Sequence, residues 1–339
     1  MKICVFGAGA IGGFLAHGLA QVEGVELSIV ARGAHLAAIK EKGLTLLRDG
    51  EETTVQMNAT KDPAELGPQD IIFNCLKAHQ SWQSAEDLTP LLKDDTTIVT
   101  CQNGVPWWYF YALEGKYEGS QIDAVDRGNR QWDIVGAHRA IGCSVYPATE
   151  IVEPGVIKHV YGDKFALGEP DGSTSDRITK ISELMEKGGF RAPILDDIRS
   201  ELWLKLWGNL CFNPISALTN GTLDVVASHP TTRGTAKAMM LEAQAIAEEL
   251  GASFRVDVER RINGAAKVGA HKTSMLQDFL AKKPMEIDAL VTAVQEMGRI
   301  TGKPTPTLDV VLGLVQQLAM SHDLYPTYPA EEVVASAAE

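Results

Sequence analysis

Hydrophobic and polar positions follow two different patterns along this chain of 339 residues. In the first half, short apolar runs rich in β-branched residues alternate with segments whose apolar residues recur at helical spacing. These runs are KICVFG, VELSIVAR, DIIFNC and TTIVTC. Short apolar runs between helical segments are typical of parallel strands, because crossover helices bury both faces of such a sheet. We therefore predict an α/β domain with a parallel sheet over residues 1–196.

The last part of this predicted domain, from about residue 105, has a looser pattern. Residues 123–142 can hold a pair of strands, and residues 140–170 predict antiparallel strands with turns at 153–155 and 161–163. The sequence DRITKISELMEKGGF predicts a helix that ends at its glycine pair, and APILDD at 192–197 predicts the last strand.

The second half of the chain is predicted to be helical. From Ile198 onward nearly every segment has helical spacing, which predicts an all-α domain over residues 197–325, followed by an Ala-rich tail at 326–339. Pro214 is predicted to kink or end the first helix, since it lacks an N–H. Pro284 and Glu286 are predicted in the first turn of a later helix that Gly302 ends.

Composition and charge narrow the classes of function. The net charge of −13 argues against a nucleic-acid partner or an anionic membrane surface, since both require basic patches. No apolar run reaches the roughly twenty residues needed to span a membrane, and glycines interrupt the signal-like N-terminus. The five cysteines form no CxxC pair, and we expect them to be buried apolar residues. We expect a cytoplasmic protein with no metal site.

A glycine-rich turn follows the first predicted strand and opens a helix. The motif is GAGAIG, with Gly7, Gly9 and Gly12 in the GxGxxG positions and Ala10 and Ile11 between them. In this strand–turn–helix context the motif is typical of a dinucleotide-binding Rossmann domain, whose helix N-terminus holds the pyrophosphate. A glycine turn without a ligand is the alternative interpretation.

The ends of the predicted strands suggest which cofactor binds. Chains that bind NAD usually carry Asp or Glu after the second strand, whereas this chain has Arg32 there. A guanidinium suits the 2′-phosphate of NADP(H), although Arg32 can also be a solvated strand-end residue. Lys77 and Asn103 follow two further strands, at the sheet edge where ligands bind, and each can instead be a turn residue.

A row of polar residues runs along an otherwise apolar helix. In ELWLKLWGNLCFNP, Lys205, Asn209 and Asn213 are spaced four apart and therefore share one face of the helix. Burying an ammonium and two amides without partners is costly, so the row faces either water or a polar ligand.

The motifs together resemble the ketopantoate reductase family (2-dehydropantoate 2-reductase). The resemblance rests on GAGAIG, LKAHQ, QNG, KLWGNLCFNP and TSMLQDFLAKKPMEID, and it extends from Met1 to about Leu324. It implies an α/β Rossmann-type N-terminal domain that binds NADPH, followed by an all-α C-terminal domain, and reduction of a small 2-oxo acid, ketopantoate, to pantoate.

The same resemblance implies roles for individual residues. Lys205 is expected to protonate the new alkoxide, with Glu286 as its acidic partner. The residues expected to hold the substrate are Asn103, Asn209, Asn213 and Ser274, and Asn103 and Lys77 are also expected beside the cofactor.

One region departs from the family pattern and leaves the substrate open. Residues 107–111 form an aromatic run, WWYFY, directly after the QNG motif. A reductase of a different, bulkier 2-oxo acid therefore remains an alternative, as does a non-catalytic NADP-sensing protein. The sequence also leaves the oligomeric state open, with a homodimer as one candidate.

Overall fold

The computed structural model describes residues 1–325, so the predicted tail at 326–339 lies outside the described residues. The chain separates into two compact units. Unit 1 comprises residues 1–102, 111–113 and 130–198, and unit 2 comprises residues 103–110, 114–129 and those from 199 onward. The chain therefore crosses between the units several times before residue 196.

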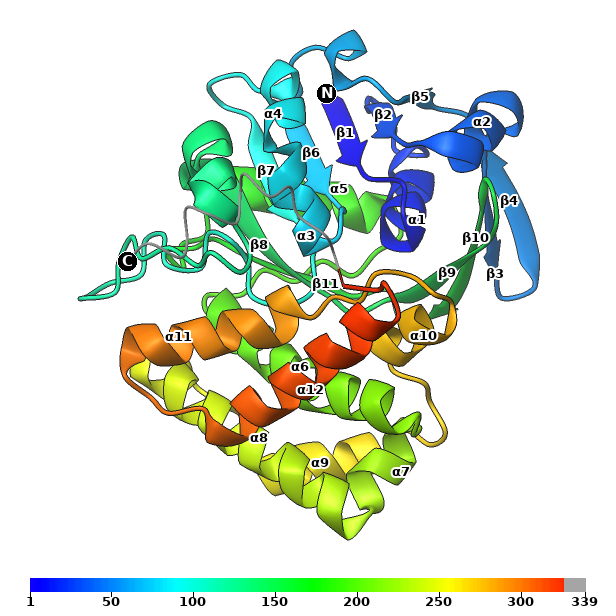
Figure 1. Cartoon of the computed structure of the whole chain (residues 1–339). Helices are drawn as coiled ribbons and strands as arrows, with labels where there is room; N and C mark the ends of the chain where they lie inside the picture. The colour runs from blue at the N-terminus through cyan, green and yellow to red at the C-terminus, as the bar shows by residue number, and fades with distance from the viewer. Residues whose placement is uncertain (326–339) are drawn as a thin grey trace. The chain divides into compact units, whose positions relative to one another are not determined.

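Unit 1 is built on a seven-stranded sheet, and the predicted parallel strands are all present. The strand order is β11-β8-β7-β6-β1-β2-β5, in which every neighbouring pair is parallel except β8 and β11 (Figure 1). Without β11 this is the Rossmann order. The strands are β1 (Lys2–Phe6), β2 (Glu26–Val30), β5 (Asn58–Thr60), β6 (Ile71–Asn74), β7 (Thr97–Thr100), β8 (Ala140–Val145) and β11 (Phe165–Gly168).

Helices pack on this sheet and bury its apolar side chains. The helices are α1 (Ala10–Leu19), α2 (Gly33–Lys42), α3 (Ala78–Ser81), α4 (Ala85–Leu88) and α5 (Asp176–Lys187). Phe14 and Leu15 of α1 join Ile3, Val5 and Ile29 of the strands in the core. Each fully buried side chain of this size contributes about 1.5–3 kcal/mol, which anchors α1 and the glycine turn that precedes it.

A second, four-stranded sheet in unit 1 has the order β4-β3-β10-β9. Its strands are β3 (Leu44–Arg48), β4 (Glu51–Val55), β9 (Ala148–Glu153) and β10 (Val156–Tyr161). The predicted turn at 153–155 joins β9 to β10, with Gly155 at φ +82°, and the predicted turn at 161–163 follows β10. The hairpin of β3 and β4 was not predicted from the sequence.

The prediction of strands was wrong in two regions. Residues 123–142 contain short helical turns at Arg127–Asn129, Gln131–Val135 and Ala137–Arg139, and only β8 begins there. The APILDD segment makes isolated bridges rather than a strand. Its backbone bonds to β11 include one to the Pro193 carbonyl, but proline has no N–H to continue a ladder.

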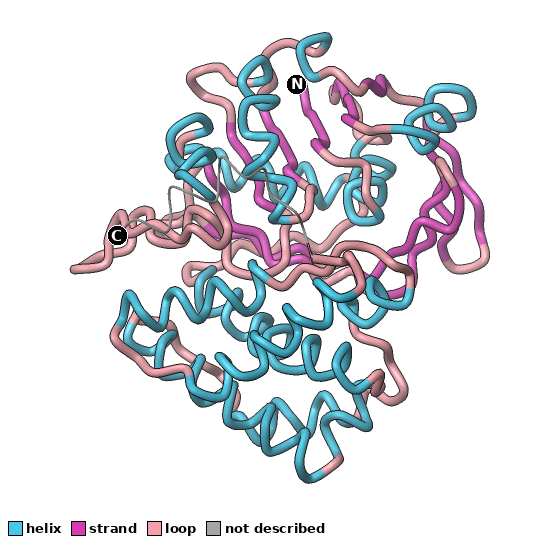
Figure 2. The backbone as a smooth tube through the Cα atoms, viewed as in Figure 1, coloured by secondary structure: helices cyan, strands magenta, loops and turns pink. Residues whose placement is uncertain are grey.

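Unit 2 is helical, as the spacing of its apolar residues predicts. Among the described residues all strands fall within unit 1 (Figure 2). The helices are α6 (Ile198–Thr219), α7 (Leu223–Ser228), α8 (Pro230–Glu249), α9 (Val258–Ala266), α10 (Ser274–Leu280), α11 (Ala293–Thr301) and α12 (Pro306–Ser321). Helix α6 continues through Pro214 to Thr219, and Gly302 ends α11 in the left-handed conformation.

Glu286 does not lie in the first turn of its helix, which corrects the sequence prediction. The regular structure begins with a π-helical turn at Asp288–Thr292 that leads into α11. Pro284 and Glu286 precede this turn in a connection without regular secondary structure. Single π turns inside helices frequently accompany functional sites, because they displace a short stretch of backbone from its helical position.

The aromatic run at residues 107–111 packs largely inside unit 2. Trp108 and Tyr109 are fully buried. The Trp203 indole donates to the Tyr109 hydroxyl at 2.7 Å, and the Arg199 guanidinium donates to the Tyr109 carbonyl at 2.9 Å. These contacts with α6 account for the assignment of residues 103–110 to unit 2.

Candidate active site

The glycine turn of unit 1 has the geometry that a dinucleotide requires. Gly7 has φ +103°, a value that side chains rarely allow. A Cβ on Gly12 would lie 2.0 Å from the Gly7 carbonyl, so only glycine permits this close packing of α1. A Cβ on Gly9 would meet nothing within 4 Å, so the backbone there is open to a ligand.

The N-terminus of α1 can receive an anion. Gly9 is its N-cap residue, and Ala10 and Ile11 form the first turn without an acidic residue or, within residues 1–325, any side-chain cap. The amides of this turn therefore present free N–H groups and the positive end of the helix dipole. These features fit the pyrophosphate of a dinucleotide.

Arg32 lies at the start of a second helix whose N-terminus can also receive an anion. It is the exposed N-cap residue of α2, whose first turn is also free of acidic side chains. The glycine turn reaches the same region, because the amides of Gly7 and Ala8 both donate to the Val30 carbonyl at the end of β2. A guanidinium beside an uncapped helix N-terminus suits a phosphate on the adenosine ribose.

His35 is a residue of this region that sequence reasoning missed. Its Nδ1 accepts from the Gly155 amide at 2.9 Å, and its Nε2 is buried without a hydrogen-bond partner in the described structure. Burial lowers the His35 pKa, and the Ala8 backbone opposes that shift. Its only signal in the sequence is a histidine three residues after Arg32.

The remaining predicted residue of unit 1 is Lys77. It follows β6 as the half-buried N-cap residue of α3. The adjacent strand end is held by a buried network that the sequence did not indicate. In it the Asn74 amide donates to the Ser81 hydroxyl at 2.7 Å, and Ser81 donates to Gln131 at 2.5 Å.

Unit 2 brings Lys205 together with Asn103. The Lys205 ammonium donates to the Asn103 side-chain oxygen at 2.7 Å, although 102 positions separate the two residues in sequence. The amide oxygen accepts a charge-assisted hydrogen bond, which fixes the direction of the ammonium without neutralising its charge. Lys205 is half-buried and therefore keeps access to a polar ligand.

The other two residues of the polar row continue along the same face of α6. The Asn213 amide is 4% exposed and donates to the Ser274 hydroxyl at 3.3 Å, so a second pair of predicted residues meets. Asn209 lies between the two pairs, half-buried, and its side chain makes no hydrogen bond to the residues that the structure describes. The row is therefore polar, partly accessible and joined to two other segments.

Glu286 is half-buried in the connection that precedes the π-helical turn. The same turn contacts the segment that carries Asn103. The Ala289 carbonyl accepts from the Val105 amide at 2.9 Å, and a Cβ on Gly104 would lie 2.3 Å from that carbonyl. Glu286 and Asn103 are thus attached to one structural element.

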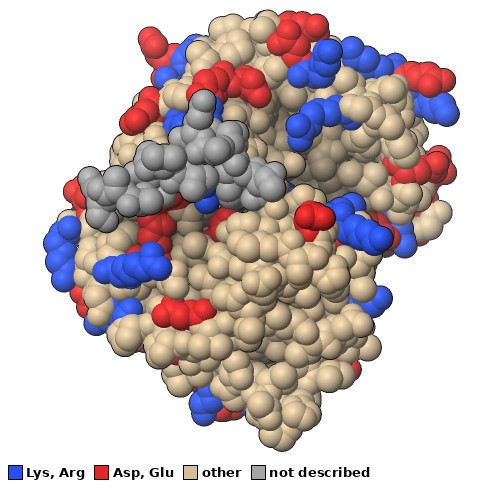
Figure 3. Space-filling view, in the orientation of Figure 1, with Lys and Arg blue, Asp and Glu red and all other residues tan. Residues whose placement is uncertain are grey.

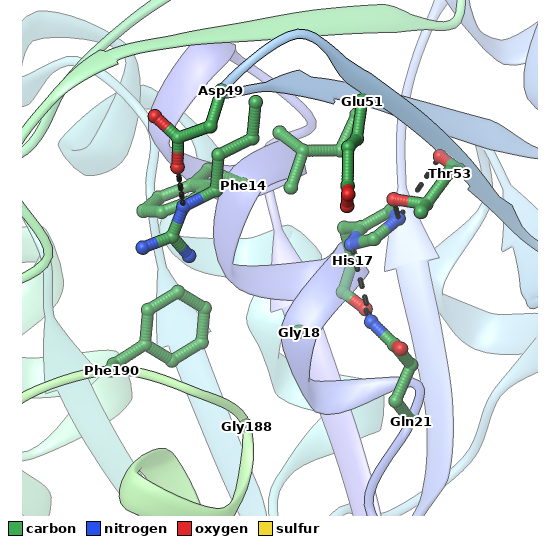
Figure 4. A pocket seen from close by; sticks show the side chains of 11 residues that line it. Phe14, His17, Gly18, Gln21, Asp49, Glu51, Thr53, Gly188 and Phe190 are labelled. Carbon is green, nitrogen blue, oxygen red and sulfur yellow. Dashed lines mark hydrogen bonds and ion pairs between the residues drawn. The ribbon is translucent and has the colours of Figure 1, made fainter.

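A pocket elsewhere in unit 1 contains none of the predicted residues. Its volume is about 300 Å³, and it lies among α1, the β3–β4 hairpin and the turn after α5 (Figure 4). His17 in its wall bonds to both the hydroxyl and the carbonyl of Thr53, and burial lowers its pKa. These contacts give His17 a structural role that joins α1 to β4.

Metal ligands and membrane-spanning helices are both absent from the described residues. Among residues 1–325, no group of histidine, cysteine, aspartate and glutamate side chains is arranged to hold a metal ion. Within that same range no helix has the length and apolar character needed to cross a membrane.

Comparison with known proteins agrees with this arrangement. The family model described as ketopantoate reductase PanE/ApbA matches residues 3–108, and the model of its C-terminal part matches residues 197–319. A 2-dehydropantoate 2-reductase from Mesorhizobium japonicum is 55% identical over 96% of this chain and 100% of its own length.

Solved structures share the fold. A protein assigned to the ketopantoate reductases from Ralstonia solanacearum has a TM-score of 0.90 at 39% identity, covering 95% of this chain and 99% of that one. A D-mandelate dehydrogenase bound to NADH and anilino(oxo)acetate has a TM-score of 0.81 at 21% identity, covering 96% and 100%, and this likeness concerns the fold alone. With its glycine turn, its polar row and a relative matched over its full length, this chain belongs to the ketopantoate reductase family.

Proposed function

We propose that the protein reduces 2-dehydropantoate (ketopantoate) to pantoate with NADPH. The observation that carries this proposal is the hydrogen bond between Lys205 and Asn103, which aims a cation from an apolar helix at a polar site. The relative from Mesorhizobium japonicum, named for this reaction, supports the choice of substrate.

The cofactor is assigned to unit 1. NADPH, when bound, supplies the hydride that is added to the 2-oxo carbon. The turn of Gly7, Gly9 and Gly12, together with the amides of Ala10 and Ile11, would hold the pyrophosphate, and Arg32 would hold the 2′-phosphate. Lys77, which follows β6, lies at the carboxyl edge of the sheet where the nicotinamide end of a dinucleotide is expected.

Lys205 has two roles in the proposed mechanism. As the 2-oxo carbon gains hydride, its oxygen becomes an alkoxide, and a cation directed at that oxygen stabilises the transition state more than the ground state. The Nζ atom then gives its proton to the alkoxide, and the resulting hydroxyl is that of pantoate. Asn103 orients the ammonium through their hydrogen bond.

The other polar residues of unit 2 are assigned to substrate binding. Asn209 and Asn213 lie on one side of α6, where Asn213 meets Ser274 of α10, and these three side chains can donate hydrogen bonds to the substrate carboxylate and hydroxyl. We assign Glu286 as the acidic partner of Lys205, since a carboxylate near the ammonium favours its charged form.

The test is a panel of 2-oxo acids that includes ketopantoate, with NADPH oxidation followed at 340 nm. We expect ketopantoate to have the highest kcat/KM. Binding of NADPH without turnover of any 2-oxo acid would instead support the NADP-sensing protein. A preference for a bulkier acid would support the other alternative, but the contacts of Tyr109 with Arg199 and Trp203 already account for much of the aromatic run.

Two further assignments belong with this function. We propose that the enzyme acts in the cytoplasm, where its substrate and NADPH are expected. We also propose a homodimer, because α12 exposes Val310 and Leu314, which are 63% and 54% exposed, and because the region that α12 crosses in Figure 1 carries few charges in Figure 3. Light scattering should give twice the mass of one chain, and Leu314→Asp should reduce it to that of a monomer.

A further inference from the structure

A short segment near the end of the described chain bonds to the residues on both sides of Glu286, to a backbone amide on one side and to a side-chain carboxylate on the other. On one side, the Met285 amide donates to the Leu324 carbonyl at 2.9 Å. On the other, the Tyr325 hydroxyl donates to the Asp288 carboxylate at 2.6 Å. Neither Leu324 nor Tyr325 has a role in the proposed mechanism, and no motif in the sequence pointed to Tyr325.

The bond between Tyr325 and Asp288 lies in a largely buried setting. Asp288 is 7% exposed and also accepts from the Thr292 hydroxyl at 2.9 Å, while the Tyr325 oxygen accepts from the Gln316 amide of α12 at 3.2 Å. Burial and the Asp288 carboxylate both raise the pKa of Tyr325, so its hydroxyl remains a donor. A buried carboxylate that loses such a donor is costly to the fold around it.

The turn that contains Asp288 also contacts the segment that carries Asn103. Asp288 begins the π-helical turn, whose next residue, Ala289, accepts from Val105 and closes against Gly104. Asn103 precedes this contact and accepts the Lys205 hydrogen bond. One turn therefore lies between Tyr325 on one side and both Glu286 and Asn103 on the other.

We infer that Tyr325 is a positioning residue for the catalytic groups of unit 2. Its hydroxyl fixes the turn at Asp288–Thr292, and through that turn it sets the place of Glu286 and the direction in which Asn103 holds Lys205. Tyr325 itself touches neither substrate nor cofactor in this scheme. The inference deepens the proposed reduction of ketopantoate and rests on it.

The test compares two substitutions that each remove one hydroxyl from a carboxylate. Tyr325→Phe keeps the ring but removes the bond to Asp288. Tyr117→Phe is the matched control, because the Tyr117 hydroxyl donates to Glu249 at 2.9 Å in the same unit. We expect Tyr325→Phe to lower kcat about tenfold, as the loss of one hydrogen bond to a charged group implies, with the Kd of NADPH unchanged. Tyr117→Phe should leave kcat within about twofold of the unmodified enzyme.

A double-mutant cycle shows whether Tyr325 acts through Asp288. Asp288→Asn alone and the double variant Tyr325→Phe, Asp288→Asn should lower kcat by nearly the same factor, since both break the same link. Independent, multiplying losses would overturn the inference, and so would a Tyr325→Phe enzyme with normal kcat.

A readout without substrate separates this inference from the proposed function. Amide hydrogen exchange at residues 285–292 should be faster in Tyr325→Phe than in Tyr117→Phe, whichever 2-oxo acid the enzyme reduces. Unchanged exchange would show that Tyr325 does not hold the turn. If exchange rises but ketopantoate is not turned over, the proposed substrate fails and the kcat comparison moves to the best acid of the panel, where an unaltered kcat again counts against Tyr325.

Discussion

Lys205 illustrates at the scale of one residue how a charge is accommodated on an apolar helix. Its neighbours in α6, Leu206 and Trp207, are buried, and an unpaired ammonium among them would be strongly unfavourable. Asn103 supplies a neutral oxygen at 2.7 Å, which satisfies one N–H of the ammonium.

Replacing Lys205 by Ala should therefore lower kcat by several orders of magnitude. General acid catalysis contributes about 10²–10⁴-fold, and the loss of the positive charge adds to that. The Kd of NADPH should remain near its normal value, because the cofactor residues belong to unit 1. Stopped-flow reduction and NADPH fluorescence titration measure the two quantities. Near-normal kcat in this variant would rule out Lys205 as the proton donor.

Arg32 should decide the preference between the two nicotinamide cofactors. Arg32→Asp replaces a phosphate-binding cation by a carboxylate that repels the 2′-phosphate and suits a free ribose hydroxyl. We expect kcat/KM for NADPH to fall by about tenfold or more, with NADH changed much less. The comparison needs both cofactors at a saturating ketopantoate concentration. Equal kcat/KM values for the two cofactors in the unmodified enzyme would contradict the assignment.

At the scale of elements, the π-helical turn is the contact that brings distant segments of unit 2 together. The carbonyl of Ala289 in this turn accepts from the Val105 amide, more than 180 positions earlier in the chain. Gly104 makes this contact possible, because it has φ +90° and no side chain to collide with Ala289.

Gly104→Ala should disrupt the turn and the active site together. The new Cβ would lie 2.3 Å from the Ala289 carbonyl, so the backbone must move and take Asn103 with it. Gly115→Ala is the control, since Gly115 has φ +107° but open space around it and incurs only the backbone strain, about 1–2 kcal/mol. We expect a larger loss of thermal stability and of kcat for Gly104→Ala. Equal losses in both variants would show that the close contact is unimportant.

At the scale of the whole molecule, charged side chains join parts of the chain that are far apart in sequence. Glu249 at the end of α8 pairs with Lys303 at 3.0 Å and with Lys116 at 3.2 Å, and it accepts from Tyr117. These partners come from the segment 114–129 and from the end of α11. The carboxylate thus ties three regions of unit 2 at its surface.

This cluster should make stability depend on pH in the acid range. The hydrogen bonds from Lys303, Tyr117 and Lys116 lower the pKa of Glu249 from 4.5 to about 2. A carboxylate with a depressed folded-state pKa stabilises the fold above its unfolded-state pKa, and that contribution is lost as the pH falls from 4.5 toward 2. Glu249→Gln should therefore unfold at a lower urea concentration than the unmodified protein at pH 7. The gap between the two midpoints should narrow below pH 4.5 and close only near pH 2, and a constant gap would argue against this origin.

Local patterns in the sequence determined a large part of this protein. The spacing of apolar residues predicted the parallel strands and the helices, and GAGAIG predicted the turn before α1, because strand, helix and turn preferences act over a few residues. The row of Lys205, Asn209 and Asn213 followed from the helical repeat alone. The resemblance to the ketopantoate reductases rested on such local motifs, and the comparisons confirmed it.

Only the tertiary structure decided which of these motifs meet. The partner of Lys205 lies 102 residues away, and no local preference encodes such a pairing. The aromatic run joined unit 2 because its large side chains gain more from burial against α6 than from remaining on a surface. Regular helical structure begins after Glu286, at the turn Asp288–Thr292, and this turn makes contacts with Val105 and Tyr325 that are distant in sequence. Local sequence sets the elements, whereas packing between distant segments sets the site.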